Sequence, residues 1–147
     1  MITGTVRSGC GRASRAFLKN DQYRGRQLEP LFGWLPYPGT LNLRVTGLAA
    51  CVKSLGEPDL LTEPETPIGP LRWWAARIEW ETPHLRSLQC FVVRGAKSQT
   101  SYLEIVSRQS LRSLGLADGS VVQVTRVRPW FSVARTASGP ISAGSRQ

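Results

Sequence analysis

The chain has 147 residues and a formal net charge of +9 at pH 7, from 19 Lys and Arg against 10 Asp and Glu. This length suits one domain with a real hydrophobic core, and the charge favours a polyanionic partner, whether nucleic acid, a phosphorylated small molecule or an anionic surface. Three scattered cysteines exclude a disulfide framework, and the lack of a long apolar run or a signal peptide excludes a membrane span, so we expect a soluble, cytoplasmic monomer.

The N-terminal part combines a short strand with a glycine-containing segment. Residues 2–6 are rich in β-branched side chains and predict a strand. Gly9 and Gly11 follow, and glycines let backbone N–H groups come close to a phosphate, while Arg12 and Arg15 add positive charge. An ordinary turn remains the alternative for this segment. Residues 17–31 have partly helical apolar spacing, which predicts a helix.

A rigid turn and a strand come next, and the strand carries two polar side chains on one face. Pro38 fixes φ and Gly39 permits a positive φ, which predicts a type II turn over residues 37–40. Residues 40–45 then alternate between polar and apolar side chains, so buried leucines fix the register. Thr40 and Asn42 therefore point the same way. A half-buried edge strand without a further role remains the alternative.

The middle of the chain has the composition of a loop, and it is followed by segments that alternate like strands. Gly, Pro and acidic residues cluster within residues 46–70 and predict a long loop with little regular structure, either a lid or an insertion. Residues 71–80, 88–93 and 103–106 predict three strands. His84 lies in a turn between the first two, without a neighbouring nucleophile, and is interpreted as a loop residue.

The last third predicts a short helix, a strand and a tail. The helix covers residues 110–114 and ends at Gly115, and a strand covers residues 121–125. Residues 131–147 have little to bury and predict a disordered basic tail. The fold class is thus mainly β: a small β barrel with one or two short helices, formed by residues 1–130.

Several motifs in a fixed order carry a family resemblance. The central one is Pro36-Tyr37-Pro38-Gly39-Thr40-Leu41-Asn42-Leu43, preceded by Ser8-Gly9-Cys10-Gly11 and followed by Glu104-Ile105-Val106 and Leu111-Arg112-Ser113-Leu114-Gly115-Leu116-Ala117-Asp118-Gly119. Over most of residues 4–127 the chain resembles the archaeal-type CTP-dependent riboflavin kinases. The resemblance implies a six-stranded cradle-loop (RIFT-like) barrel that transfers the CTP γ-phosphate to the 5′-hydroxyl of riboflavin, giving FMN and CDP with Mg²⁺.

The resemblance also implies roles for particular residues. Thr40 and Asn42 would be the Mg²⁺ ligands, and Thr100 and Glu104 would hold the flavin. The nucleotide would be bound by two segments, which comprise Gly9, Cys10, Gly11, Arg12, Ala13, Ser14 and Arg15, and Gln109, Ser110, Leu111 and Arg112. Phosphoryl transfer needs mainly positioning and charge neutralisation, so the lack of an evident nucleophile agrees with this chemistry.

Two alternatives remain open at the level of the sequence. One is a CTP-dependent kinase that acts on another small alcohol. The other is a small barrel that binds nucleic acid without catalysis, because basic residues beside aromatic ones, as in Arg72-Trp73-Trp74, are typical of stacking platforms.

Overall fold

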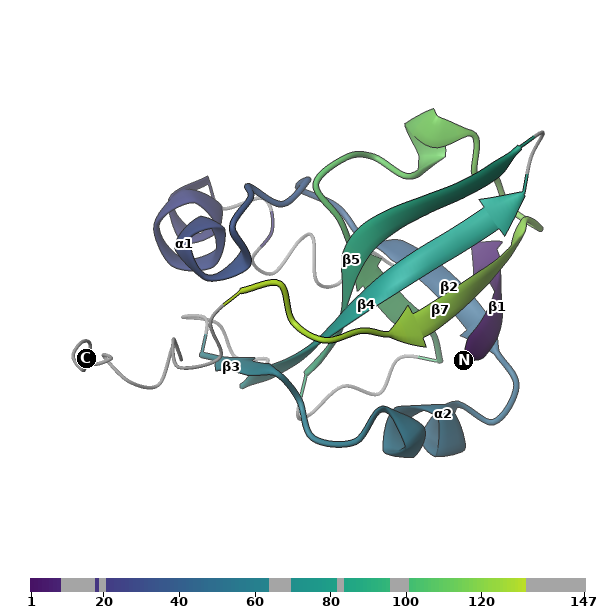
Figure 1. Ribbon diagram of the computed structural model, residues 1–147, viewed down its shortest axis with the longest axis horizontal. Helices are drawn as coiled ribbons and strands as arrows, with labels where there is room; N and C mark the ends of the chain where they lie inside the picture. Colours follow the sequence, from purple (N-terminus) through teal and green to yellow (C-terminus); the bar gives the residue numbers. More distant parts are fainter. Residues whose placement is uncertain (9–17, 19–20, 64–69, 82–83, 96–100, 132–147) are drawn as a thin grey trace.

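Seven antiparallel strands form the body of the molecule in the computed structural model, which describes residues 1–8, 18, 21–63, 70–81, 84–95 and 101–131 (Figure 1). They are β1 (Ile2–Arg7), β2 (Leu41–Val45), β3 (Leu60–Thr62), β4 (Leu71–Glu81), β5 (Leu85–Gly95), β6 (Leu103–Val106) and β7 (Val121–Arg126). Their order is β3-β4-β5-β6-β2-β1-β7, and β4 also pairs with β7. That pairing closes six strands into a barrel and leaves β3 as an added strand, which confirms the predicted fold class.

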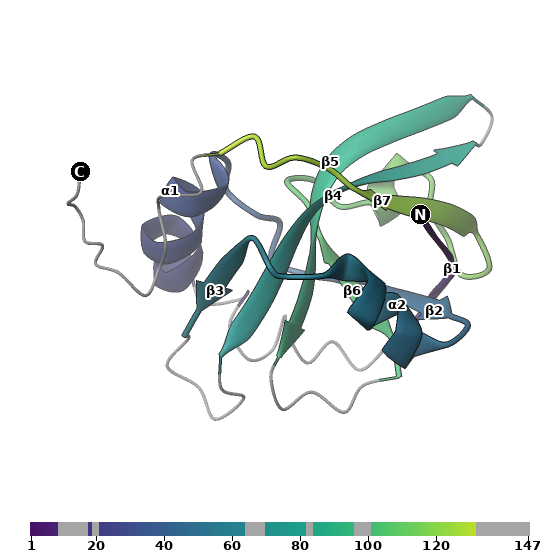
Figure 2. The ribbon, with the colours of Figure 1, turned by 60° about the horizontal axis from the view of Figure 1, so that its bottom comes forward.

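The described residues contain four short helical segments, namely η2 (Tyr23–Leu28), α1 (Glu29–Phe32), α2 (Leu48–Leu55) and η3 (Arg112–Leu114). The first two form one continuous segment that overlaps the helix predicted for residues 17–31 and ends one residue beyond it. The segment η3 lies within the helix predicted before Gly115. Gly115 ends it with a positive φ of 106° and an N–H group that donates to Arg112. The helices α1 and α2 lie on different sides of the barrel in both views (Figures 1 and 2).

The prediction of a long irregular loop over residues 46–70 is wrong for its first part. This part forms α2 and β3, while residues 64–69 lie outside the described ones. Leu55 of α2 is buried against the barrel interior, and Leu60 of β3 is buried on its outside. Thr62 accepts a hydrogen bond of 2.9 Å from the Trp73 indole. Burial of these side chains overrides the turn-rich composition around them.

Strand β4 supplies side chains to two separate cores because its alternate residues face opposite sides of the sheet. Trp74, Ala76 and Ile78 point into the barrel and pack with Leu41 and Ile105. Trp73 and Ala75 instead face outward and belong to a second buried cluster under η2 and α1. The alternation predicted for this strand is confirmed, and both of its faces are buried along these residues.

Six aromatic side chains within the second cluster have rings in contact with one another, and we call them the outer aromatic cluster. They are Phe32, Trp34, Trp73, Phe91, Trp130 and Phe131. Phe32 of α1 stacks on Phe91 of β5 with 4.2 Å between ring centroids, so the cluster attaches the helical segment to the barrel. The ring centroids of Phe131 and Phe91 are 5.5 Å apart, so Phe131 packs with the barrel and is not part of a tail. Residues 132–147 lie outside the described part of the chain.

Trp130 ties the end of the described chain to α1, because its indole N–H donates a 2.8 Å hydrogen bond to the Phe32 carbonyl. We expect Trp130→Phe to lower the free energy of unfolding by about 1–2 kcal/mol, since it removes this bond and part of a packed ring. Denaturant unfolding measures the change. Leu85→Ala, at a side chain that is 68% exposed, is the control and should change little. Equal stability of Trp130→Phe and wild type would contradict the attachment.

Candidate functional site

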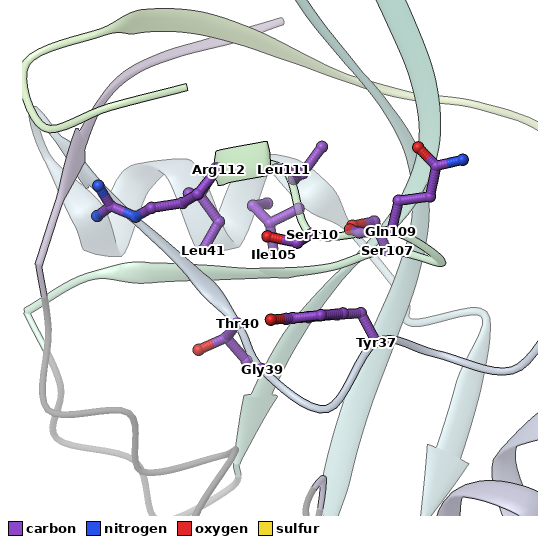
Figure 3. A pocket seen from close by; sticks show the side chains of 10 residues that line it. All are labelled: Tyr37, Gly39, Thr40, Leu41, Ile105, Ser107, Gln109, Ser110, Leu111 and Arg112. Atoms are coloured by element: carbon purple, nitrogen blue, oxygen red, sulfur yellow. The ribbon is translucent and has the colours of Figure 1, made fainter. Parts of the chain in front are cut away.

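A pocket of about 270 Å³ lies where the predicted turn meets the segment before η3 (Figure 3). Three stretches of chain line it: residues 37–41 without Pro38, then Ile105 and Ser107, then residues 109–112. The lining side chains are Tyr37, Thr40, Leu41, Ile105, Ser107, Gln109, Ser110, Leu111 and Arg112, with Gly39 between the first two. The structure therefore brings Thr40 together with all four residues of the second predicted nucleotide segment.

The turn before β2 is held in place by two backbone hydrogen bonds. The Tyr37 N–H donates to the Ser107 carbonyl at 2.8 Å, and the Gly39 N–H donates to the Tyr37 carbonyl at 2.8 Å. The second bond defines a three-residue turn centred on Pro38. The predicted type II turn is wrong, because Gly39 does not adopt a positive φ. A Cβ atom at this position would lie 3.2 Å from the ring of Tyr37, a tight contact that a small shift of the exposed ring would relieve.

The opposite wall is built from the segment that leads into η3. The Ser107 hydroxyl donates to the Gln109 carbonyl at 2.6 Å and bends the chain after β6. Leu111 is buried and anchors the segment to the barrel interior. Its neighbours Ser110 and Arg112 are thereby presented at the pocket.

The two ends of the pocket differ in chemistry. The Arg112 guanidinium and the Gln109 carboxamide lie at opposite ends, and the Thr40 hydroxyl lies toward the Arg112 end (Figure 3). A guanidinium recognises phosphate oxygens through several N–H groups, whereas a carboxamide offers one donor group and one acceptor, as nucleobase edges do. The apolar side chains of Leu41, Ile105 and Leu111 lie between the ends. This arrangement suits a nucleotide whose phosphates lie near Arg112.

Thr40 also belongs to a polar cluster on the other face of the strands. Its hydroxyl donates a 3.3 Å hydrogen bond to a carboxylate oxygen of Glu104. Asn42 lies directly opposite Glu104 in the β2–β6 ladder, and both residues are only 8% exposed. Side chains at directly opposed ladder positions are neighbours. We call Thr40, Asn42 and Glu104 the polar cluster; it joins the two predicted metal ligands to a residue predicted for the flavin, while Thr100 lies outside the described residues.

The polar cluster offers Mg²⁺ a carboxylate oxygen beside the two neutral side chains that were predicted as its ligands. Thr40 and Asn42 are neutral, and Mg²⁺ in proteins is usually held by one or two carboxylates together with substrate phosphates. Glu104 adds one carboxylate. Over the residues that the structure describes, no group of three or more His, Cys, Asp or Glu side chains is placed to hold a metal. The polar cluster is thus suited to Mg²⁺ in combination with phosphate oxygens.

The predicted phosphate loop lies outside the described residues, from Gly9 and Cys10 through Gly11, Arg12, Ala13 and Ser14 to Arg15. Its starting point is placed, because Ser8 directly follows β1. The Ser8 hydroxyl donates to one carboxylate oxygen of Asp118 at 2.8 Å, and Arg112 donates to the other at 2.6 Å. The sequence places Asp118 in the last of the family motifs but indicates no role for it.

Other candidate groups do not converge on the pocket. Cys90 is fully buried, and burial raises the pKa of its thiol, as expected for an inert core cysteine. His84 is exposed at the turn between β4 and β5, consistent with a loop residue. Trp73 and Trp74 are buried, so neither ring forms the exposed stacking platform that the nucleic-acid alternative needs. No helix among the described residues is long and apolar enough to cross a membrane.

Comparisons with known proteins agree with the order of the motifs. Residues 6–125 match the family model CTP-dep_RFKase, whose description reads "Domain of unknown function DUF120". A protein named riboflavin kinase from Methanobrevibacter smithii is 33% identical over 128 residues, which cover 84% of this chain and 97% of that protein. A second riboflavin kinase, from Methanocella arvoryzae, is 32% identical over 138 residues, which cover 85% of this chain and 56% of the relative.

Proposed function

Because the chain belongs to the CTP-dependent riboflavin kinase family, we propose that it transfers the γ-phosphate of CTP to the 5′-hydroxyl of riboflavin, giving FMN and CDP. The family's name supports CTP as the donor, and the names of the two relatives support riboflavin as the acceptor. The observation that carries the proposal is the convergence of Thr40 and residues 109–112 on one pocket, although these residues lie far apart in the chain.

The pocket positions the donor. The cytosine end of CTP would face Gln109, and the triphosphate would extend toward the guanidinium of Arg112. Phosphoryl transfer gains mainly from preorganised charge and geometry, so Arg112 needs no covalent role. Leu41 and Leu111 line the pocket, and their apolar side chains would strengthen charge interactions with a bound nucleotide by lowering the local dielectric.

Thr40 lies where donor and acceptor would meet. The pocket is on the face of β2 and β6 that carries Leu41 and Ile105, whereas Asn42 and Glu104 face the other side of the same strands. Thr40 lines the pocket and also donates to Glu104. We therefore place the riboflavin 5′-hydroxyl on the Glu104 side, where the carboxylate accepts a hydrogen bond from it.

Thr40 and Asn42 would hold Mg²⁺ beside the phosphates, and the bound ion would offset negative charge on the transferring phosphoryl group. We expect Mg²⁺ to bind the free protein weakly, because one carboxylate and two neutral oxygens form a poor site alone. Titration calorimetry should show tighter CTP binding with Mg²⁺ than with a chelator. Tight binding of Mg²⁺ without nucleotide would place the metal elsewhere.

The activity is tested directly by incubation with riboflavin, Mg²⁺ and CTP, followed by chromatography for FMN and CDP. ATP in place of CTP tests the choice of donor. Folded protein that binds CTP and yields no FMN would contradict riboflavin as the acceptor and favour another alcohol. Equal FMN from ATP would contradict the assignment of CTP.

A further inference from the structure

Asp118 joins Ser8, which lies 110 positions before it in the chain, to Arg112, which lies six positions before it. Each of its two carboxylate oxygens accepts a hydrogen bond from one of these side chains. One oxygen accepts the Ser8 hydroxyl at 2.8 Å, where the chain leaves β1. The other accepts Nη2 of Arg112 at 2.6 Å, where Arg112 lines the pocket. The carboxylate is therefore a bridge between the start of the predicted phosphate loop and the charged end of the pocket.

The turn that carries Asp118 is itself fixed to β1. The Gly119 N–H donates to the Val6 carbonyl at 2.8 Å, and the Val6 N–H donates to the Ser120 carbonyl at 2.8 Å. Gly119 has a positive φ of 93°, which favours glycine at that position. The Ser120 hydroxyl accepts the Ala117 N–H at 3.1 Å and closes the turn. These hydrogen bonds fix the backbone of Asp118 relative to β1.

This bridge is poorly placed to stabilise the fold. The side chains of Arg112 and Asp118 are 42% and 52% exposed, and exposed ion pairs contribute little to stability. Hydrogen bonds from Arg112 and then Ser8 hold the pKa of Asp118 below its ordinary value, so the carboxylate stays charged at neutral pH. A charged, fixed carboxylate next to a pocket arginine is better explained by what it does to that arginine.

We propose that Asp118 is a positioning residue that holds the Arg112 guanidinium toward the triphosphate of CTP, an inference that rests on the proposed function. Arginine has a long side chain whose freedom is lost when it binds a phosphate. Asp118 accepts a hydrogen bond from Nη2 of Arg112, so the N–H groups on Nη1 and Nε stay available to the ligand. Within the described residues, Asp118 is the one side chain to which Arg112 donates a hydrogen bond. The arginine is thus already oriented before CTP enters.

The test measures CTP affinity by calorimetry, with Mg²⁺ and without riboflavin. Asp118→Ala should weaken CTP binding about 10-fold, the scale for losing one well-placed hydrogen bond to a charged group. Asp118→Asn should lie between alanine and wild type, because its amide keeps one acceptor oxygen and loses the charge. In an Arg112→Ala background the Asp118→Ala change should cost almost nothing, since Asp118 acts through Arg112.

Asp59 provides the matched control. Its carboxylate forms an ion pair with Arg126, with 2.8 Å between Oδ1 and Nη2, and neither residue lines the pocket. Asp59→Ala should lower the melting temperature, because this pair is more buried, and should leave CTP affinity unchanged. The control thus separates the loss of any Asp–Arg pair from the loss of this one.

Each outcome decides between the alternatives. Unchanged or tighter CTP binding in folded Asp118→Ala would overturn the proposal, and tighter binding would mean that Asp118 competes with phosphate for Arg112. Additive costs of the Asp118 and Arg112 changes would also overturn it. Wild-type protein that fails to bind CTP would overturn the proposed donor, a separate result that needs no variant.

Discussion

Asn42→Leu should lower kcat about 100-fold, the scale for loss of one group that stabilises a transition state, while the barrel stays folded. Asn42 faces Glu104 in the polar cluster and is almost fully buried. Leucine has a similar size but no oxygen for a metal ion. The strand itself is held by its backbone ladder and by Leu41 and Leu43, which point to the barrel interior. Turnover with saturating CTP and riboflavin measures the loss.

Arg44→Leu is the control for this prediction. Arg44 lies two residues further along the same face of β2 and is exposed, so the same leucine there should leave kcat unchanged. Circular dichroism and thermal unfolding should show a folded barrel for both variants. Normal turnover of a folded Asn42→Leu protein would leave β2 as a scaffold and place the metal elsewhere.

The second large effect is expected for Glu104→Gln. Glutamine keeps the shape and one acceptor oxygen, but it removes the negative charge of the carboxylate. That carboxylate accepts the hydrogen bond from the Thr40 hydroxyl and would orient the riboflavin 5′-hydroxyl. We expect kcat to fall about 100-fold or more, since a positioned acceptor of a reacting proton contributes on that scale. Riboflavin binding, followed through the change in flavin fluorescence, should weaken as well.

Glu79→Gln tests whether any loss of charge on the barrel has the same effect. Glu79 pairs with Arg77 at 3.5 Å on β4 and does not line the pocket, so this variant should retain normal turnover. Glu104→Gln with normal kcat and normal riboflavin binding would remove Glu104 from the acceptor side of the site.

Local patterns in the sequence predicted six of the seven strands among the described residues and missed the short β3. The alternation in residues 40–45 and 71–80 gave the faces of β2 and β4, because side chains alternate strictly along a strand. The turn at Gly39 was predicted with the wrong geometry, since Pro-Gly favours a type II turn in general, whereas here the Gly39 N–H donates to the Tyr37 carbonyl and the Tyr37 N–H donates to the Ser107 carbonyl. The bond to Ser107 joins residues far apart in the chain, which local propensity does not describe.

The missed parts of the site arise from contacts between distant residues. Glu104 was predicted for the flavin and Thr40 for the metal, but the sequence did not indicate that the Thr40 hydroxyl donates to the Glu104 carboxylate. Nor did it show that Asn42 lies opposite Glu104 in the β2–β6 ladder. Asp118 lies 110 positions from Ser8, and no local pattern around Asp118 connects the two residues. The helix α2 was missed because Gly, Pro and acids around it obscured a short apolar face that is buried only by the finished barrel.

The closure of the barrel has a consequence for the order of events during synthesis. Ile2 of β1 faces Val124 of β7, and β7 also pairs with β4, so the first strand made needs the last one as a neighbour. Until β7 has been made, β1 and β4 each keep a free edge that is open to pairing with other chains. Contacts between such distant residues form slowly. A nascent chain is therefore most exposed to aggregation just before its final strand emerges.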